Sequence, residues 1–160
     1  MGHLGEFSRS TRLFLRAYRW RRIDPVPWQP LSKPLAECRV GVVTSAGFVA
    51  PGQEPFDSSA RGGDYGFRTL SADVDVQSLI ECHRSHSFDR AGLEVDRGLA
   101  FPVERLRELA TEGRIGAVSR QHLSFMGSIT APGRLIKHSA PEAAKVFVEE
   151  AVDVALLVPV

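Results

Sequence analysis

The chain has 160 residues, of which 43% are hydrophobic and 24% are charged, the proportions of an ordinary single globular domain. Its formal net charge of +1 excludes the strong positive field of a nucleic-acid-binding protein. No apolar run reaches the ~20 residues of a membrane-spanning helix, and the start of the chain lacks the apolar core of a secretory signal. With only Cys38 and Cys82, the chain has no disulfide framework, so we expect a cytoplasmic protein.

Residues 1–23 are predicted to form a basic amphipathic helix. Between Phe7 and Ile23 there are six arginines and no acidic residue, and Leu13, Phe14 and Tyr18 fall at helical spacing. Such a helix could lie on a membrane surface, bind a polyanion or serve as an organellar presequence. The simpler interpretation is a peripheral helix whose arginines are solvated or paired.

Residues 24–37 are predicted to form an extended arm, because prolines recur at positions 25, 27, 30 and 34. Trp28 lies in the middle of this arm, where exposure of its indole to water would be costly. We therefore expect the arm to pack against the domain or a partner chain and to bury Trp28.

Residues 38–160 are predicted to form one α/β domain with an open, mostly parallel sheet and crossover helices. A capping box, Ser139 to Glu142, is expected to open the second helix. A long loop, residues 51–64, follows the first strand. The expected strands cover residues 39–44, 67–70, 78–82, 115–118 and 154–158, and the first helix covers residues 101–112.

The final strand, residues 154–158, is apolar on both faces, which is typical of a strand in the interior of a sheet. The sequence stops at Val160, where an α/β domain would place a ligand-binding loop. We therefore expect the domain to be incomplete at this end, and the open apolar strand indicates a homo-oligomer as one alternative to a monomer.

Five residues could supply metal or proton chemistry. Cys82, His83 and His86 are close in sequence, and His122 or His138 could join them on a metal. The spacing lacks a second pair of ligands, so we expect no metal site. His83 and His122 are instead candidate general acids or bases, although such histidines commonly only bond loop backbone.

A second group of candidates follows the first strand. Thr44, Ser45 and Gly47 offer hydroxyl and N–H groups that could hold a substrate carboxylate, and Arg68 could pair with it. The alternative is that they are ordinary turn residues. The chain lacks the glycine-rich motifs of nucleotide-binding proteins and the serine motif of hydrolases, which excludes nicotinamide, flavin, ATP and hydrolase functions.

Several stretches together resemble one known family, the glycine/sarcosine/betaine/D-proline reductase selenoprotein B family in its short form. The similarity covers roughly residues 24–160. The stretches that carry it are Pro25–Trp28, Pro30–Leu35, Arg39–Thr44, Gln53–Asp57, Gly63-Asp64, Phe67-Arg68, Phe101–Leu109 and Ser124–Gly127.

This resemblance implies reductive cleavage of the C–N bond of a small amino acid or betaine. In the family, the strand that corresponds to residues 154–160 is followed by a selenocysteine or cysteine, so the resemblance implies a reading frame truncated at a UGA codon after Val160. The selenolate attacks the carbon that bears the nitrogen. In the glycine and proline systems a pyruvoyl group on a separate subunit activates the amine.

For this chain the resemblance implies supporting roles only. Thr44, Ser45 and Gly47 would form a carboxylate cradle with Arg68 as a partner, while His83 and His122 would donate protons. The expected partners are a small amine or amino-acid substrate and other reductase subunits. The alternative hypothesis is a non-catalytic α/β binding or assembly subunit that recognises a small carboxylate or a partner protein.

Overall fold

The computed structural model describes residues 8–18, 22–85, 88 and 90–160. The chain divides into two compact units, Met1–Pro30 and Leu31–Val160. The first unit contains helix α1 (Arg9–Ala17), which begins where the Ser8 hydroxyl accepts the Thr11 N–H at 3.2 Å and which buries none of its residues. This confirms a helix in the predicted N-terminal segment, of which residues 1–7 and 19–21 lie outside the described residues. Among the described residues, no helix has the length and apolar character needed to cross a membrane.

The proline-rich arm has no regular structure before a short 3₁₀ turn, η2 (Leu35–Glu37). Trp28 is 84% exposed, and the packing of its indole against the domain remains a prediction, because Trp28 and the domain belong to separate units of the structure. The prolines at positions 25, 27, 30 and 34 favour an extended backbone and remove N–H donors from it. Contact with a partner chain remains a prediction.

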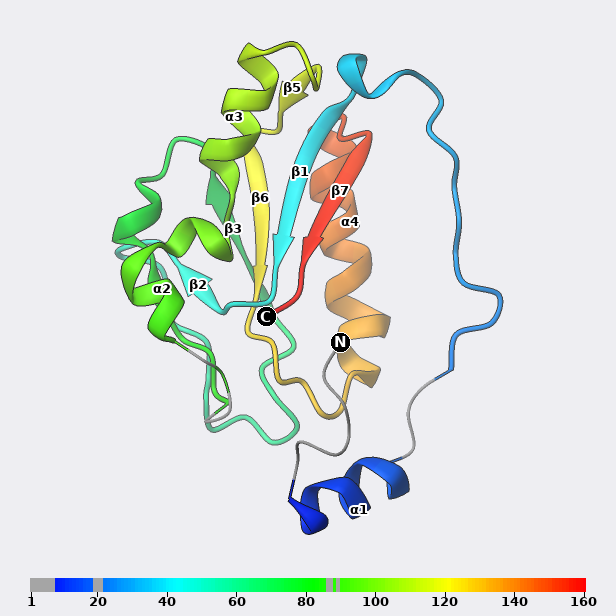
Figure 1. Cartoon of the computed structure of the whole chain (residues 1–160), viewed down its shortest axis with the longest axis vertical. Helices are drawn as coiled ribbons and strands as arrows, with labels where there is room; N and C mark the ends of the chain where they lie inside the picture. The colour runs from blue at the N-terminus through cyan, green and yellow to red at the C-terminus, as the bar shows by residue number, and fades with distance from the viewer. Residues whose placement is uncertain (1–7, 19–21, 86–87, 89) are drawn as a thin grey trace. The chain divides into compact units, whose positions relative to one another are not determined.

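The second unit is built on an open, mostly parallel sheet, as predicted. Its central strand β1 (Arg39–Thr44) pairs in parallel with β7 (Val154–Val158) along one edge. Along its other edge β1 pairs in parallel with β5 (Ala117–Val118) and then with β6 (Gln121–Phe125). Strand β3 (Phe67–Ser71) pairs antiparallel with β6 and completes the sheet. Figure 1 shows β1, β6 and β7 pointing to the same end.

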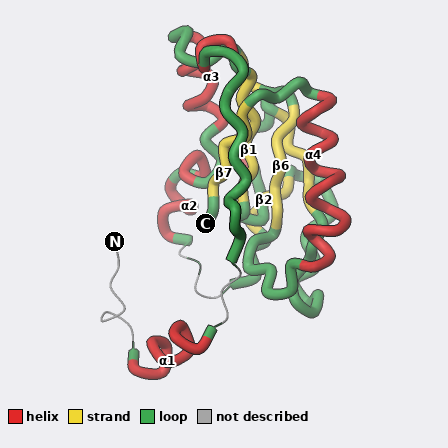
Figure 2. Tube along the Cα trace, turned by 90° about the vertical axis from the view of Figure 1, so that its right-hand side faces the viewer, coloured by secondary structure: helices red, strands yellow, loops and turns green. Residues whose placement is uncertain are grey.

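Helices cover both faces of this sheet (Figure 2). Helix α3 (Val103–Thr111), α2 (Ala91–Val95) and the 3₁₀ turn η4 (Arg97–Leu99) lie on one face. Helix α4 (Ala140–Glu149) lies on the other. The two faces carry separate apolar clusters: α2 and α3 pack into the one that contains Val42 and Phe101, and α4 packs into the one that contains Leu123 and Phe147. The result is the three-layer arrangement expected of a parallel sheet.

A smaller antiparallel pair lies beside the sheet and consists of β2 (Phe48–Val49) and β4 (Ile80–Glu81). The predicted strand at residues 78–82 is therefore too long, because the 3₁₀ turn η3 (Val76–Ser78) occupies the chain before β4. The Asp75 side chain caps this turn by accepting the Gln77 N–H at 3.0 Å. This local bond competes with strand pairing.

Two further predictions about the sheet differ from the structure. The expected strand at 115–118 contains only the two residues of β5, because the Ile115 N–H is still bonded to Leu109 O of α3. Strand β6 was not predicted from the sequence. It is short, and His122 and Ser124 interrupt its apolar side chains, so its pattern resembles a loop although its three middle residues are buried.

The predicted capping box at Ser139 is also wrong. A π-helical turn, η5 (Leu135–Ser139), runs directly into α4, so Ser139 is a helical residue with no capping bond. Its hydroxyl instead donates to the Tyr65 backbone oxygen. Ser139 therefore ties the helix to the loop before β3 rather than starting the helix.

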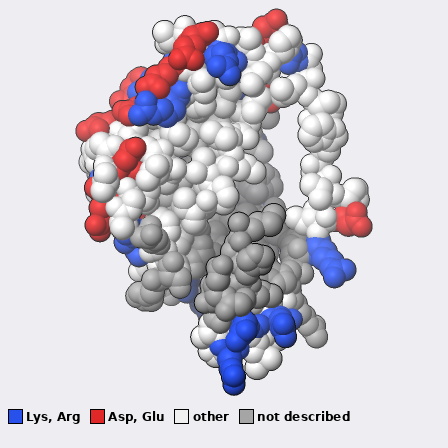
Figure 3. Space-filling view, in the orientation of Figure 1, with Lys and Arg blue, Asp and Glu red and all other residues white. Residues whose placement is uncertain are grey.

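Strand β7 lies at the edge of the sheet, and its apolar side chains are exposed. Leu157 is 67% exposed and Leu156 is 37% exposed. Figure 3 shows charged side chains gathered over α2 and α3 and a face over β1 and β7 that carries none in this view. An apolar edge of this kind favours further packing by another segment or chain.

The packing of α4 on β1 depends on Gly41. A Cβ atom at this position would lie 2.8 Å from Cζ of Phe147, closer than side-chain carbons approach. We expect Gly41→Ala to lower the free energy of unfolding by about 1–3 kcal/mol, the usual cost of overpacking a core. Chemical denaturation monitored by circular dichroism measures this change.

Gly133→Ala is the matched control, because nothing lies within 4 Å of a Cβ at that position. Adding Phe147→Leu to Gly41→Ala should recover part of the loss. If Gly41→Ala is as stable as Gly133→Ala, the proposed contact between Gly41 and Phe147 does not limit the packing.

Candidate functional site

The carboxyl ends of β1, β6 and β7 meet at one edge of the sheet (Figure 1). In open α/β sheets this edge is where ligands bind. A hollow of about 230 Å³ opens there between the strand ends and the first turn of η5. Its lining is mostly apolar and consists of Val43, Thr44, Ser45, Phe125, Gly127, Ile129, Leu135, Leu157, Val158 and Pro159.

Ser45 joins the end of β1 to the end of β7. Its backbone N–H donates to Val158 O at 3.1 Å, and its hydroxyl accepts the Val160 N–H at 3.0 Å and lies 3.4 Å from Val160 O. The hydroxyl of buried Thr44 accepts the Ala46 N–H at 3.2 Å. Both predicted cradle hydroxyls are therefore engaged with backbone at this edge.

Gly47 and Gly127, both with positive φ, allow three loops to pack closely against one another next to the hollow. Gly47 has φ +69°, and a Cβ there would lie 2.9 Å from the His83 backbone nitrogen. Gly127 has φ +68°, and a Cβ there would lie 2.6 Å from Nε2 of His83 and would collide with Ser45 O. Only glycine accepts both the backbone conformation and the close contact. The loops at residues 45–47, 82–83 and 127 consequently form one crossing.

His83 lies at this crossing and is 7% exposed. Its Nδ1 accepts the Ser85 N–H at 3.2 Å, so in the neutral ring Nε2 carries the proton. Burial lowers the pKa of His83, which favours this neutral form. Within the described part of the chain Nε2 has no hydrogen-bond partner. His83 is therefore a neutral imidazole with an uncommitted N–H.

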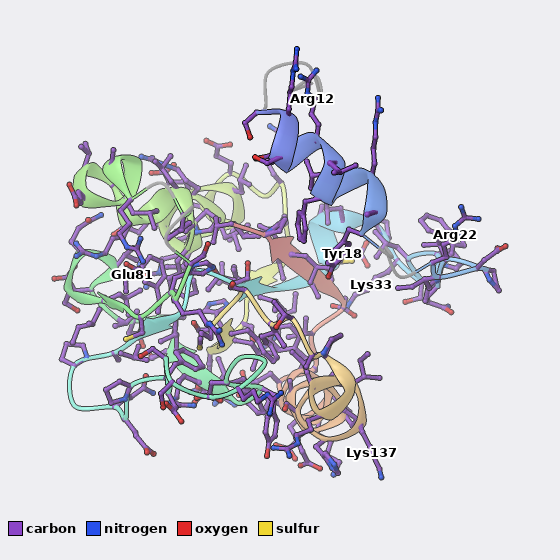
Figure 4. The ribbon with its side chains drawn as sticks, turned by 90° about the horizontal axis from the view of Figure 1, so that it is seen from below. Arg12, Tyr18, Arg22, Lys33, Glu81 and Lys137 are labelled. Atoms are coloured by element: carbon purple, nitrogen blue, oxygen red, sulfur yellow. The ribbon has the colours of Figure 1, made fainter. Side chains whose placement is uncertain are left out.

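Arg90 holds the backbone around His83. Its Nη2 donates to His83 O at 2.6 Å, and its Nε pairs with Oε2 of Glu81 at 2.6 Å. The Glu81 carboxylate also accepts the His83 backbone N–H. Figure 4 looks onto this edge of the sheet, with Glu81 on the β4 side and Lys137 pointing outward from η5. These bonds fix the His83 backbone at the crossing.

His122 occupies a different place, within the core between β1 and β6. It is fully buried, and its Nδ1 accepts the Val42 N–H at 3.0 Å. Its ring meets the edge of Phe101 at 5.4 Å. Burial, with a smaller contribution from Arg107, lowers the pKa of His122 to about 4. In the structure His122 therefore completes the pairing of β1 and does not line the hollow.

Arg68 is also separate from the hollow. Its Nε donates to Glu54 O at 2.8 Å and its Nη2 to Pro55 O at 2.9 Å, while its guanidinium lies 4.4 Å from the Phe56 ring centre. These contacts fasten the loop before β3. In the structure, backbone carbonyls therefore accept hydrogen bonds from the Arg68 guanidinium. Its predicted pairing with a substrate carboxylate stays a prediction.

The structure thus brings Thr44, Ser45, Gly47 and His83 together at the carboxyl edge. Sequence reasoning missed Gly127 and gave no role to Ser124, which pairs with Thr44 across the two strands. The Ser124 hydroxyl is buried and has no partner among the described residues. The available signal was Gly127 in the run Ser124–Gly127, because a glycine permits a close approach of another backbone segment.

The cysteine and histidine candidates do not assemble into a metal site in the described part of the chain. There, no three His, Cys, Asp or Glu side chains lie close enough to share an ion. His86 lies outside the described residues, and His138 is exposed on η5. Cys38 and Cys82 are both free thiols.

Comparison with known proteins gives the family. The sequence profile of glycine/sarcosine/betaine reductase selenoprotein B (GRDB) matches residues 10–159. The chain belongs to this family. The D-proline reductase subunit gamma of Acetoanaerobium sticklandii is 32% identical over 136 residues, which are 84% of this chain and 54% of that protein. No solved structure matches the chain significantly.

Two further relatives are similar over most of the chain. The sarcosine reductase complex component B subunit beta of Peptoclostridium acidaminophilum is 31% identical, over 84% of this chain and 30% of that protein. The glycine reductase complex component B subunit gamma of Carboxydothermus hydrogenoformans is 28% identical, over 76% of this chain and 28% of that protein. The chain thus spans about half the length of the first relative and less than a third of the other two.

The buried, neutral state of His122 predicts a dependence of stability on pH. The unfolded chain has a His pKa of 6.5 and the folded chain about 4, so the unfolded state binds more protons between these values. The stabilisation is complete above pH 6.5 and is lost as the pH falls toward 4. Its full size is about 3 kcal/mol, to be measured by urea unfolding across this range.

His122→Asn should remove most of this pH dependence while retaining an acceptor for the Val42 N–H. His138→Gln, at an exposed histidine, is the control and should leave the pH profile unchanged. An unchanged profile in His122→Asn would show that another group, such as His83, carries the effect.

Proposed function

We propose that the chain is part of a reductase component that cleaves the C–N bond of a small amino acid or betaine of the glycine, sarcosine, betaine or D-proline class. The observation that supports this most is the carboxyl edge, where Ser45 and the His83 crossing adjoin the hollow at the end of β7. Membership of the reductase selenoprotein B family supports the same reaction class.

The reactive group of this proposal is a selenocysteine or cysteine directly after Val160. The Ser45 hydroxyl accepts the Val160 N–H and donates to Val160 O. A residue after Val160 would therefore lie beside the hollow. An ionised selenolate or thiolate is a strong nucleophile toward the carbon that bears the nitrogen. Ser45 would position this nucleophile.

His83 is the proposed proton donor to the departing amine. Its Nε2–H has no hydrogen-bond partner among the described residues, and the acid that would protonate the nitrogen is the imidazolium, which the lowered pKa makes the minor form at neutral pH. A donor assists where the leaving nitrogen is an unprotonated primary or secondary amine, whereas the quaternary nitrogen of betaine leaves as neutral trimethylamine without one. His122 is the less suitable candidate, since its ring is enclosed between β1 and Phe101.

Partners are part of the proposal. The relatives are named as subunits of D-proline, sarcosine and glycine reductases, which supports association with further reductase subunits. A subunit that carries a pyruvoyl group, implied by the family resemblance, would be one of them. The exposed apolar β7 edge offers a surface for such association or for a second copy of the chain. The two free thiols suit a reducing, cytoplasmic setting.

The test is an assay of the complete protein, purified from its native cells with its associated subunits. With a dithiol reductant, we expect it to release ammonia from glycine, methylamine from sarcosine or trimethylamine from betaine, or to open the ring of D-proline. Ser45→Ala should lower kcat about tenfold, because it loses the bonds that position the end of β7.

Ser71→Ala is the matched control, since its hydroxyl also accepts a backbone N–H, that of Asp73 at 3.1 Å, but lies at the other edge of the sheet. Its kcat should not change. A complete protein that binds these substrates but never cleaves them would favour the non-catalytic binding subunit instead.

A further inference from the structure

A second and larger depression adjoins the hollow at the carboxyl edge. This groove has a volume of about 1190 Å³ and runs between two loops, residues 57–66 and residues 130–134. The groove and the hollow share a wall, because a Cβ on Gly63 of the groove would lie 3.0 Å from Cα of Ile129, which lines the hollow.

Backbone bonds hold the two loops of the groove in place. The N–H groups of Thr130 and Ala131 both donate to Gly62 O, at 2.9 and 3.2 Å. Gly62 has φ +87°, and a Cβ there would lie 2.7 Å from the Ala131 side chain, so only glycine permits this approach. Arg84 also donates to Ala60 O at 2.9 Å. The groove is therefore formed before any ligand binds.

The two acids that line the groove are already satisfied by its own backbone. Asp64 accepts the N–H groups of Asp57 at 2.9 Å and Gly66 at 2.8 Å, one on each carboxylate oxygen. Asp57 accepts the Ser59 N–H at 2.8 Å and the Ser59 hydroxyl at 2.6 Å. These acids shape the loop, and their hydrogen-bonding capacity is largely used.

The two arginines that line the groove have no such partners. Among the described residues, the guanidinium groups of Arg61 and Arg134 make no ion pair or hydrogen bond, and both side chains are exposed. Arg134 lies over the Tyr65 ring at 5.6 Å, which limits its directions. The two guanidinium groups thus keep their N–H donors available, while backbone and Ser59 groups already bond the two neighbouring carboxylates. This combination suits the groove to binding an anion.

We propose that Arg61 and Arg134 bind the carboxylate of a small substrate in this groove. A guanidinium presents two parallel N–H donors that match the two oxygens of a carboxylate. This inference rests on the proposed function in taking the ligand to be the amino-acid or betaine substrate. Its carboxylate would be held on the groove side of Ile129, with the nitrogen-bearing carbon toward the hollow.

The first experiment measures binding to the complete protein by isothermal titration calorimetry. The probes are glycine betaine, tetramethylammonium, which lacks the carboxylate, and inorganic phosphate. We expect betaine to bind and tetramethylammonium not to bind. Arg61→Gln and Arg134→Gln should each raise the Kd for betaine about tenfold, the usual effect of removing a hydrogen bond to a charged group.

Arg114→Gln is the matched control, because Arg114 is an exposed arginine outside the groove. It should leave the Kd unchanged, and thermal unfolding should show that all three variants remain folded. Unchanged betaine binding in both groove variants would overturn the proposal. Binding of phosphate in the groove without binding of betaine would overturn it as well.

An activity measurement separates this inference from the proposed function. If the groove variants lose carboxylate binding while the complete protein releases no amine, the reductase proposal fails and the carboxylate site stands. If amine release continues with an unchanged KM in both groove variants, the site fails and the reductase proposal stands. A raised KM with an unchanged kcat in the variants would support both.

Discussion

The structure depends on the enclosure of β1 from every side. β7 pairs with one edge of this strand, and β5 and β6 pair with the other. Phe147 packs directly on Gly41 from one face, while Val42 packs into the α3 cluster on the opposite face. Where the β5 and β6 ladders leave a gap, His122 accepts the Val42 N–H. A strand held this tightly gives the loop after Thr44 a fixed starting point.

This fixed point explains why polar groups gather at the carboxyl edge. The chain leaves β1 through Ser45 and Gly47, which bond to the ends of β7 and β6 respectively. Gly127 lets His83 approach to contact distance, so a neutral imidazole comes to lie under the strand ends. Beyond Ile129 the arginine-lined groove continues the same edge. The proposed chemistry and the proposed carboxylate site thus share one rigid support.

Elements with a clear apolar pattern could be predicted from the sequence. These are β1 as a β-branched run, β7 as a fully apolar run, and α3 from its apolar face and the Gly113 that ends it. Strand β6 could not, because His122 and Ser124 are buried polar residues whose partners come from distant strands. The capping box at Ser139 had the right residues, but the π turn before it continues the helix. For the site, Ser45 and His83 were identifiable as candidates, whereas their meeting depends on Gly127, 44 residues beyond His83.

The central claim is that a selenocysteine or cysteine follows β7 at this edge. It is tested most directly by the intact mass and selenium content of the protein from its native cells, with the peptide across Val160 sequenced by mass spectrometry. The account predicts a product heavier than 17.6 kDa with selenocysteine, or a reactive cysteine, directly after Val160. A product with neither residue after β7 would contradict it.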